Sequence, residues 1–296
     1  MAMYATRSHT TLPARRSFDL PGGTMAAWHW PNPGAPRLVF VHANGFCASA
    51  YRRVLEPLAD TYDILAPDLR GHGRTALPAD PATHRSWDVY ARDLLALIER
   101  LGRRPDVMAG HSMGAVGALI AASRLPDVPR LALIEPVVLP RSVYAVSRSP
   151  LGFLMRNRLA IARQARRRRN SWPDRAAALA RYAGHPTFRR WAAGTLEDYL
   201  EDGLRETEAG TVVLACNPAW EAANYEAQGH DLGRAARRAA PQARVLKAEH
   251  GSTVVRAPAL AGRGARLTDM DGVGHLAPME APERVAAWLK QAAAPG

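Results

Sequence analysis

The sequence has only two cysteines in 296 residues, Cys47 and Cys216, and they lie far apart. A disulfide scaffold and a cysteine-based metal site are therefore not expected, and a reducing compartment fits. Long apolar runs are also missing, so we expect no membrane span. Residues 1–20 contain three arginines but no apolar run, which argues against a secretory signal and for a cytoplasmic protein. The absence of acids before Asp19 also fits an organellar transit segment.

Acidic residues are fewer than basic ones, 27 against 39, which gives a net charge of +12. This charge favours anionic partners over long range. No nucleic-acid motif accompanies it, and arginine far outnumbers lysine, so we expect no nucleic-acid partner. The most basic segment, residues 163–169, has two interpretations. It is either a solvated helix face or a surface that steers an anionic, carboxylate- or CoA-bearing substrate.

Apolar residues make up 47% of the chain, enough for a sizeable core, and their pattern indicates the fold class. Short apolar runs alternate with helical segments on both sides of a long middle block. Such runs suit strands that are buried on both faces. They occur at residues 37–42, 62–67, 106–109, 130–134, 243–248 and 265–268, after a predicted hairpin at 16–20 and 24–30. The alternation predicts an α/β fold with a mostly parallel central sheet and helices on both faces.

Residues 141–240 show little strand signal and much helix signal. We therefore predict a helical cap inserted after the sixth strand. The expected core domain comprises residues 1–140 and 241–296.

One motif carries chemical information by its spacing. Gly110-x-Ser112-x-Gly114 follows a predicted strand and precedes an alanine-rich helix. A nucleophile on such a sharp turn needs small residues two positions before and after it, because the strand and helix would otherwise collide. The turn also places the serine hydroxyl near a helix N-terminus, whose free N–H groups favour a developing negative charge.

The chain resembles the α/β-hydrolase family through four motifs in the family's order. They are His42-Ala43-Asn44-Gly45, Asp68-x-Arg70-Gly71-His72-Gly73, Gly110-His111-Ser112-Met113-Gly114 and Gly274-His275-x-x-Pro278-x-Glu280. The resemblance implies Ser112 as nucleophile and His275 as base. It also implies an oxyanion hole made by the backbone N–H groups of Asn44 and Met113, although Ala43 replaces the family's commoner glycine. A serine nucleophile argues against epoxide-hydrolase and dehalogenase chemistry, which in this fold uses a carboxylate.

The resemblance leaves two candidates for the acid of the triad. Gly251 occupies the position where the family usually has an aspartate, and Glu249 lies close to it. A second arrangement in the family places the acid after the sixth strand, where Glu135 lies in a Leu-Ile-Glu-Pro setting like that of haloalkane dehalogenases. We favour Glu135 and keep Glu249 as the alternative.

Together these residues predict a serine hydrolase that cleaves a small ester-like acyl substrate without metal or cofactor. His42, His111, Trp172 and Trp191 are candidate substrate contacts, with loop shaping or core packing as the alternative for each. An acyltransferase, a cofactor-free perhydrolase and a non-catalytic binding protein are the other functions considered. The sequence indicates neither the substrate nor the oligomeric state.

Overall fold

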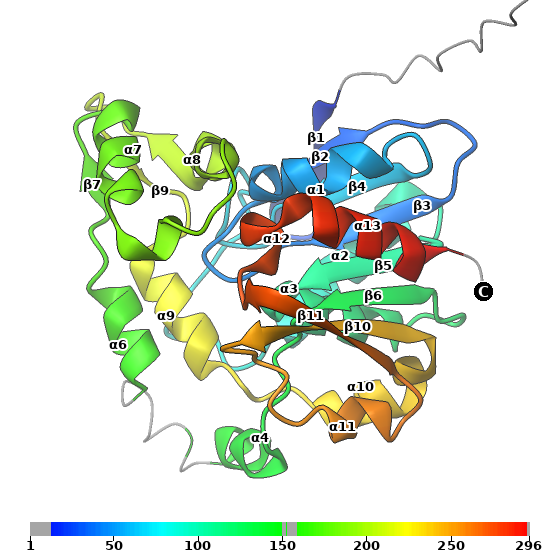
Figure 1. Cartoon of the computed structure of the whole chain (residues 1–296). Helices are drawn as coiled ribbons and strands as arrows, with labels where there is room; N and C mark the ends of the chain where they lie inside the picture. The colour runs from blue at the N-terminus through cyan, green and yellow to red at the C-terminus, as the bar shows by residue number, and fades with distance from the viewer. Residues whose placement is uncertain (1–12, 150–151, 153–158, 295–296) are drawn as a thin grey trace, which may run out of the picture.

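The computed structural model describes residues 13–149, 152 and 159–294 (Figure 1). Most of the basic N-terminal stretch considered above lies outside these residues. Within the described ranges, no helix combines the length and apolar character needed to cross a membrane.

An eight-stranded sheet forms the centre of the molecule, in the order β1-β2-β4-β3-β5-β6-β10-β11. β2 is antiparallel to both of its neighbours, and the strands from β4 to β11 are parallel. This is the mostly parallel sheet predicted from the apolar runs. The strands are β1 Ala14–Leu20, β2 Gly23–Trp30, β3 Arg37–Val41, β4 Asp63–Pro67, β5 Val107–His111, β6 Arg130–Ile134, β10 Ala243–His250 and β11 Arg266–Gly274.

Helices cover both faces of the sheet, as predicted (Figure 1). Alternate residues of β3 show why the strand is apolar throughout. Leu38 and Phe40 pack on one face, whereas Val39 and Val41 pack on the other. The first face is covered by α1 Arg52–Leu55 and α13 Pro282–Ala293, with α12 Ala277–Glu280 nearby. The second face is covered by α2 Asp88–Leu101, α3 Met113–Ala122, α10 Leu232–Ala239 and α11 Pro258–Ala261.

Short 3-10 turns complete the core. The short α1 is flanked by η1 Ala48–Tyr51 and η2 Glu56–Leu58. Pro57 within this stretch has no N–H to continue an α-helical ladder. The remaining 3-10 turns are η3 Pro186–Phe188 and η4 Ala240–Gln242.

The block inserted between β6 and β10 is mainly helical, as predicted, and it also contains a small sheet. Its helices are α4 Arg141–Arg148, α6 Ala160–Arg166, α7 Arg175–Ala183, α8 Thr195–Gly203 and α9 Pro218–Glu226, followed by α10. The sheet has the order β7-β9-β8, formed by β7 Ser171–Trp172, β8 Leu204–Glu206 and β9 Val212–Leu214. Strands of two or three residues are too short to show a period-2 pattern. α10 packs against α3 of the core, although it belongs to the predicted cap range.

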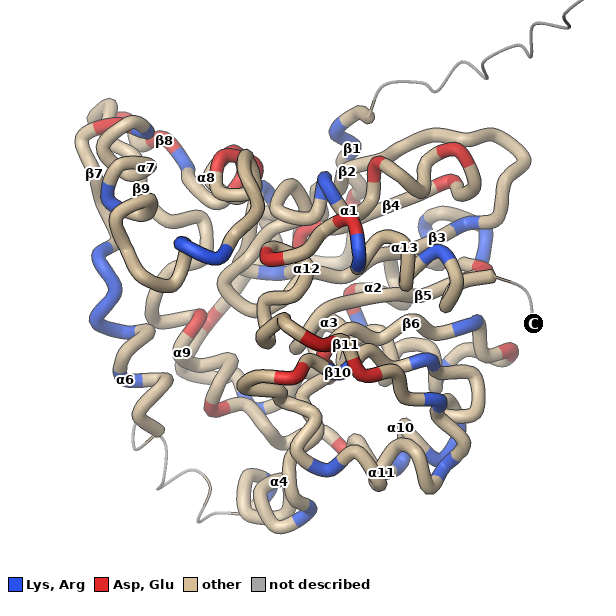
Figure 2. Tube along the Cα trace, in the orientation of Figure 1, with Lys and Arg blue, Asp and Glu red and all other residues tan. Residues whose placement is uncertain are grey.

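Basic residues are spread over core and cap in the view of Figure 2. In the Arg-rich segment, Arg166 pairs with Glu226 at 2.8 Å and Arg168 with Glu221 at 2.5 Å. These two arginines are therefore bound to acids of α9. This pairing favours a structural use of the segment over a free anionic steering surface.

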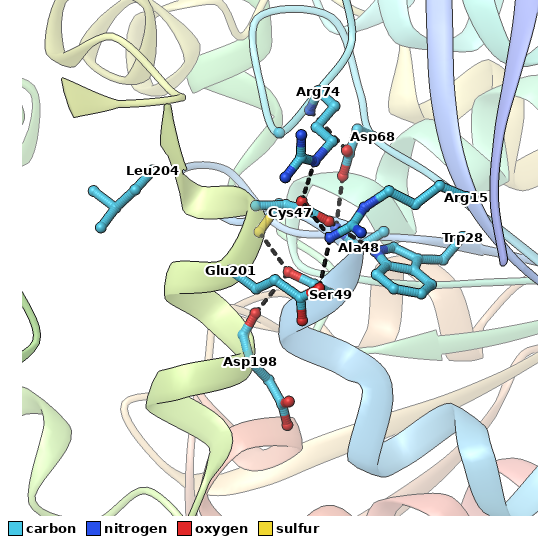
Figure 3. A network of polar contacts seen from close by, with 12 residues as sticks. Arg15, Trp28, Cys47, Ala48, Ser49, Asp68, Arg74, Asp198, Glu201 and Leu204 are labelled. Carbon is cyan, nitrogen blue, oxygen red and sulfur yellow. Dashed lines mark hydrogen bonds and ion pairs between the residues drawn. The ribbon is translucent and has the colours of Figure 1, made fainter. Parts of the chain in front are cut away.

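Figure 3 shows polar contacts between α8 of the cap and the core, and a buried carboxylate, Asp202, accepts several of them. Asp202 accepts hydrogen bonds from Trp28 Nε1 at 2.8 Å, from Arg15 Nη2 at 2.9 Å and from Arg74 Nε. Its side chain is 1% exposed. Burial disfavours the charged form, but the hydrogen bonds from Arg74, Trp28 and Arg15 together lower the pKa of Asp202. Ser49 Oγ donates to the carbonyl of Asp198 one turn earlier, at 2.6 Å.

We expect Asp202→Ala to lower the free energy of unfolding by about 2 kcal/mol, because it leaves the buried Trp28 Nε1–H without its acceptor and removes the ion pairs with the half-exposed Arg15 and Arg74. Urea denaturation followed by circular dichroism measures the loss. The matched control is Asp269→Ala, which removes a pair with Lys247 of the same kind but with the Asp269 side chain 68% exposed. That variant should lose less than about 1 kcal/mol. Equal losses in the two variants would contradict the role of Asp202 as the anchor.

Candidate active site

The turn between β5 and α3 has the strained geometry that its glycine spacing predicts. Ser112 adopts φ 55° and ψ −119°, a conformation that L-residues rarely take. A Cβ at Gly110 would lie 2.8 Å from the Gly114 backbone, and one at Gly114 would lie 2.3 Å from the carbonyl oxygen of Val41. Side chains at either position would therefore push the strand and helix apart.

Three predicted residues meet at the carboxyl edge of the sheet. Ser112 follows β5, Glu135 follows the neighbouring β6, and His275 follows β11. Ser112 Oγ lies 3.0 Å from His275 Nε2, and His275 Nδ1 lies 3.0 Å from Glu135 Oε2. Because the carboxylate accepts from Nδ1–H, the Nε2 atom is free to accept the proton of the serine hydroxyl.

Glu135 is fully buried, and several donors compensate its charge. Oε1 accepts from Ala248 N–H and Ser252 Oγ, each at 2.7 Å, and Oε2 accepts from Thr253 N–H at 2.9 Å. Burial opposes ionisation, but the hydrogen bonds from His275, Ser252, Ala248 and Thr253 outweigh it and lower the pKa of Glu135. The group beside His275 is therefore a carboxylate at neutral pH.

Glu249, the alternative acid, lies elsewhere. Its side chain is 48% exposed and accepts from Gly272 N–H at 2.7 Å. The structure thus brings Glu135, and not Glu249, to His275. Ser252 and Thr253 were not predicted from the sequence as part of the site. The loop after β10, where the family usually places the acid, here supplies hydrogen-bond donors to an acid from β6.

The Asn44 loop lies beside the elbow. The N–H of Met113 is the first of α3 and has no acceptor within the helix. No hydrogen bond within the described ranges involves the N–H of Asn44. The Asn44 side chain is engaged by the cap, because Nδ2 donates to the carbonyl of Glu221 at 3.0 Å and Oδ1 accepts from Asn224 Nδ2 at 2.8 Å. The backbone N–H groups of Asn44 and Met113 are thus free of acceptors in the described part of the chain, and their role as oxyanion donors stays a prediction.

His42 and His111 are supports of the site rather than substrate contacts. Both rings are fully buried. His42 Nδ1 donates to the carbonyl of Ala43 at 2.7 Å, and Nε2 accepts from Leu69 N–H at 2.8 Å. His111 Nε2 donates to the carbonyl of His275 at 2.8 Å, and its Nδ1 accepts from the Tyr51 hydroxyl at 2.7 Å. With both nitrogens occupied and no exposed surface, neither ring is available to a substrate.

The two predicted tryptophans have different surroundings. Trp172 is 3% exposed and packs inside the cap against Tyr182, with ring centroids 5.7 Å apart. Trp191 is partly buried and stacks on Phe46 of the Asn44 loop at 5.9 Å. Only Trp191 is thus brought beside the loop of the site, and its contact with substrate stays a prediction. No group of three or more His, Cys, Asp or Glu among the described residues is arranged to hold a metal ion.

Comparison with known sequences shows the family to which the chain is similar. A sequence model of the alpha/beta hydrolase family matches residues 38–288. "Uncharacterized hydrolase YugF" of Bacillus subtilis is 35% identical over 115 residues, which are 38% of this chain and 41% of that protein. "2-(Acetamidomethylene)succinate hydrolase" of Mesorhizobium japonicum is 33% identical over 95 residues, 32% of this chain and 33% of that protein. The match spans less than half the length of these relatives.

Solved structures resemble the chain over nearly its full length. The crystal structure of E-2-(acetamidomethylene)succinate hydrolase has a TM-score of 0.72 and 20% identity, covering 95% of this chain and 98% of that one. The thioesterase domain from the curacin biosynthetic pathway has a TM-score of 0.74 and 17% identity, covering 95% and 100%. At these identities the similarity establishes the fold alone.

The buried histidines predict a loss of stability in mild acid. Burial lowers the pKa of His42 to about 4, of His111 to about 3 and of His230 to about 4. The unfolded chain, with histidine pKa values of about 6.5, binds more protons below that pH, so stability falls as the pH drops from 6.5 towards 4. Each histidine contributes a slope of up to about 1.4 kcal/mol per pH unit. Asp68, whose pKa burial raises to about 6, takes up a proton in the folded state and offsets part of this loss.

Urea unfolding at pH 7.5 and 5.5 measures this slope. The variant His230→Phe keeps an aromatic ring against Trp87, on which His230 stacks at 4.9 Å. Between these two pH values the variant should lose about 1.4 kcal/mol less stability than wild type, because the unfolded histidine takes up its proton over the lower half of this range. The same slope in wild type and variant would contradict the role of this histidine, and stability independent of pH would contradict the whole account.

Proposed function

Because the chain belongs to the alpha/beta hydrolase family, we propose that it is a serine hydrolase that cleaves an ester-like acyl substrate through an acyl-enzyme intermediate. The observation that carries the proposal is the continuous hydrogen-bond chain from Ser112 through His275 to the buried carboxylate of Glu135. Such a chain pairs a nucleophile with a base and orients that base through a third group.

The first half of the reaction forms the acyl-enzyme. His275 Nε2 takes the hydroxyl proton as Ser112 Oγ attacks the substrate carbonyl. Glu135 keeps Nδ1 protonated and stabilises the imidazolium that forms. The oxyanion accepts hydrogen bonds from the N–H groups of Asn44 and Met113, and the N-terminal end of α3 adds positive potential. His275 then gives its proton to the leaving group.

The second half releases the acid product. Water enters the position left by the leaving group, and His275 removes a proton from it as it attacks the acyl carbonyl. Collapse of the tetrahedral intermediate breaks the bond to Ser112 Oγ, which regains its proton from His275. The names of similar structures, a thioesterase domain and an enol-lactonase from Burkholderia xenovorans, support acyl cleavage as the reaction class. We propose a small-molecule acyl substrate, without assigning its charge.

A fluorophosphonate probe and p-nitrophenyl esters of increasing length test the proposal. The probe should modify wild type at Ser112, as peptide mapping would show, and should not modify Ser112→Ala. Addition of competing alcohols or peroxide separates hydrolysis from acyl transfer and from perhydrolysis. A wild type that neither reacts with the probe nor cleaves any ester would contradict the proposal and leave a binding function.

The acid provides a sharper prediction. We expect Glu135→Gln to lower kcat by about 10³-fold, because the imidazole loses the charge that orients it and stabilises its protonated form. The matched control is Glu249→Gln, which changes the half-exposed carboxylate near the end of β10 and should leave kcat within about twofold. Steady-state kinetics on one ester compares the two variants. Normal turnover in Glu135→Gln together with a large loss in Glu249→Gln would reverse the assignment.

A further inference from the structure

The Asn44 loop is held by the cap through an amide pair. Asn224 of α9 is fully buried, and its Nδ2 donates to Asn44 Oδ1 at 2.8 Å. Asn44 Nδ2 donates in turn to the carbonyl of Glu221 at 3.0 Å. Because a carbonyl can only accept, this second bond fixes the orientation of both amides. Glu221 and Asn224 are three residues apart on α9, so a single helical turn binds both ends of the Asn44 side chain.

Asn224 is itself fixed from the core side. Its Oδ1 accepts from the Tyr90 hydroxyl at 2.6 Å and is 2.9 Å from His84 Nε2. Its carbonyl oxygen accepts from Trp87 Nε1 at 2.9 Å. The two partners of Oδ1 leave the amide little freedom to rotate, so it presents its NH₂ group to Asn44 in one direction. The Trp87 bond reaches only the main chain of α9 and does not orient this amide.

The next residue of the loop is also bound from the cap. The carbonyl of Gly45 accepts from the Tyr199 hydroxyl of α8 at 3.2 Å. Gly45 has φ +76°, and a Cβ there would lie 3.1 Å from the Glu221 carboxyl group. That carboxyl group pairs with Arg168 at 2.5 Å. The cap therefore packs directly on the loop, at a position where the positive φ favours glycine and a Cβ would crowd the Glu221 carboxyl group.

We propose that Asn224 is a positioning residue for the oxyanion hole, an inference that rests on the proposed function. The donor expected from this loop is the backbone N–H of Asn44, and a backbone N–H points wherever its peptide plane is held. The amide pair with Asn224 and the bond to Glu221 hold that plane through the side chain. Productive orientation of the donor then requires α9 to be seated on the core, so the cap takes part in transition-state stabilisation.

Three single variants separate positioning from general packing. Asn224→Ala removes the cap side of the amide pair. Asn44→Ala removes the loop side but keeps the backbone N–H of residue 44. This variant retains the other contacts of Asn224, so it still tests the inference if Asn224→Ala does not fold. The matched control is Trp87→Phe, which deletes one hydrogen bond to the Asn224 carbonyl without touching Asn44.

The measurements are kcat and KM for a p-nitrophenyl ester, the inhibition constant of a trifluoromethyl ketone, and Tm. A trifluoromethyl ketone forms a tetrahedral oxyanion on the serine, so its affinity reports the oxyanion hole. We expect Asn224→Ala and Asn44→Ala each to lose about 10–100-fold in kcat and a similar factor in ketone affinity, with KM within about threefold. Trp87→Phe should keep kcat and ketone affinity within about twofold of wild type. The double variant should be no worse than the singles, since both remove one interaction.

Two results overturn the inference. One is normal kcat and ketone affinity in folded Asn224→Ala or Asn44→Ala. The other is a loss in Trp87→Phe as large as in these variants at equal Tm, which would make the effect one of packing. In either case a wild type that reacts with fluorophosphonate at Ser112 leaves the hydrolase proposal intact. A wild type without esterase or probe reactivity contradicts the hydrolase proposal itself, and this inference with it.

Discussion

The site depends on two strained residues that are held by the sheet. Among the described non-glycine residues, Ser112 and Glu135 alone have positive φ, 55° and 47°. Each directly follows a parallel strand and still donates its N–H to the neighbouring strand. Ser112 N–H bonds to the carbonyl of Ile134 at 2.9 Å, and Glu135 N–H bonds to that of Leu246 at 2.8 Å. Conformations of this kind cost about 1–3 kcal/mol each, and these buried hydrogen bonds between strands offset that cost. The same bonds place hydroxyl and carboxylate on either side of His275.

The charge of Glu135 is maintained by geometry rather than by a cation. A fully buried carboxylate is strongly destabilised without partners. Here the loop after β10 turns Thr253 N–H and the Ser252 hydroxyl towards it, and Ala248 N–H contributes from the end of the strand. The carboxylate that contacts His275 thus follows β6, and the loop after β10 supplies hydrogen-bond donors to it. The sequence analysis leaves Glu135 and Glu249 as candidates, and these contacts are made by Glu135.

The sequence predicts those features that depend on local pattern. Continuous apolar runs indicate the parallel strands, and β6 has the predicted bounds. The glycine spacing predicts the strained turn at Ser112, and the collision avoided at Gly110 is local to that turn, whereas the one avoided at Gly114 is with the end of β3. The support of Glu135 could not be predicted, since backbone N–H groups carry no signal of residue type. The Asn44–Asn224 contact joins residues 180 positions apart, and only the folded chain brings them together. The strands β7 to β9 are too short to produce a periodic pattern.

The cap is bound to the core at two separated places, and this bears on how substrate reaches Ser112. Asp202 on α8 is held by Arg15, Arg74 and Trp28, whereas Asn224 on α9 is held by groups from α2 and the preceding loop. A rigid opening of the whole cap would have to break both sets of buried polar contacts, each costly to leave unpaired. Movement of segments between these anchors breaks neither. Under the proposed function, access by such local movement would keep Asn44 in place, as preorganised stabilisation of an oxyanion requires.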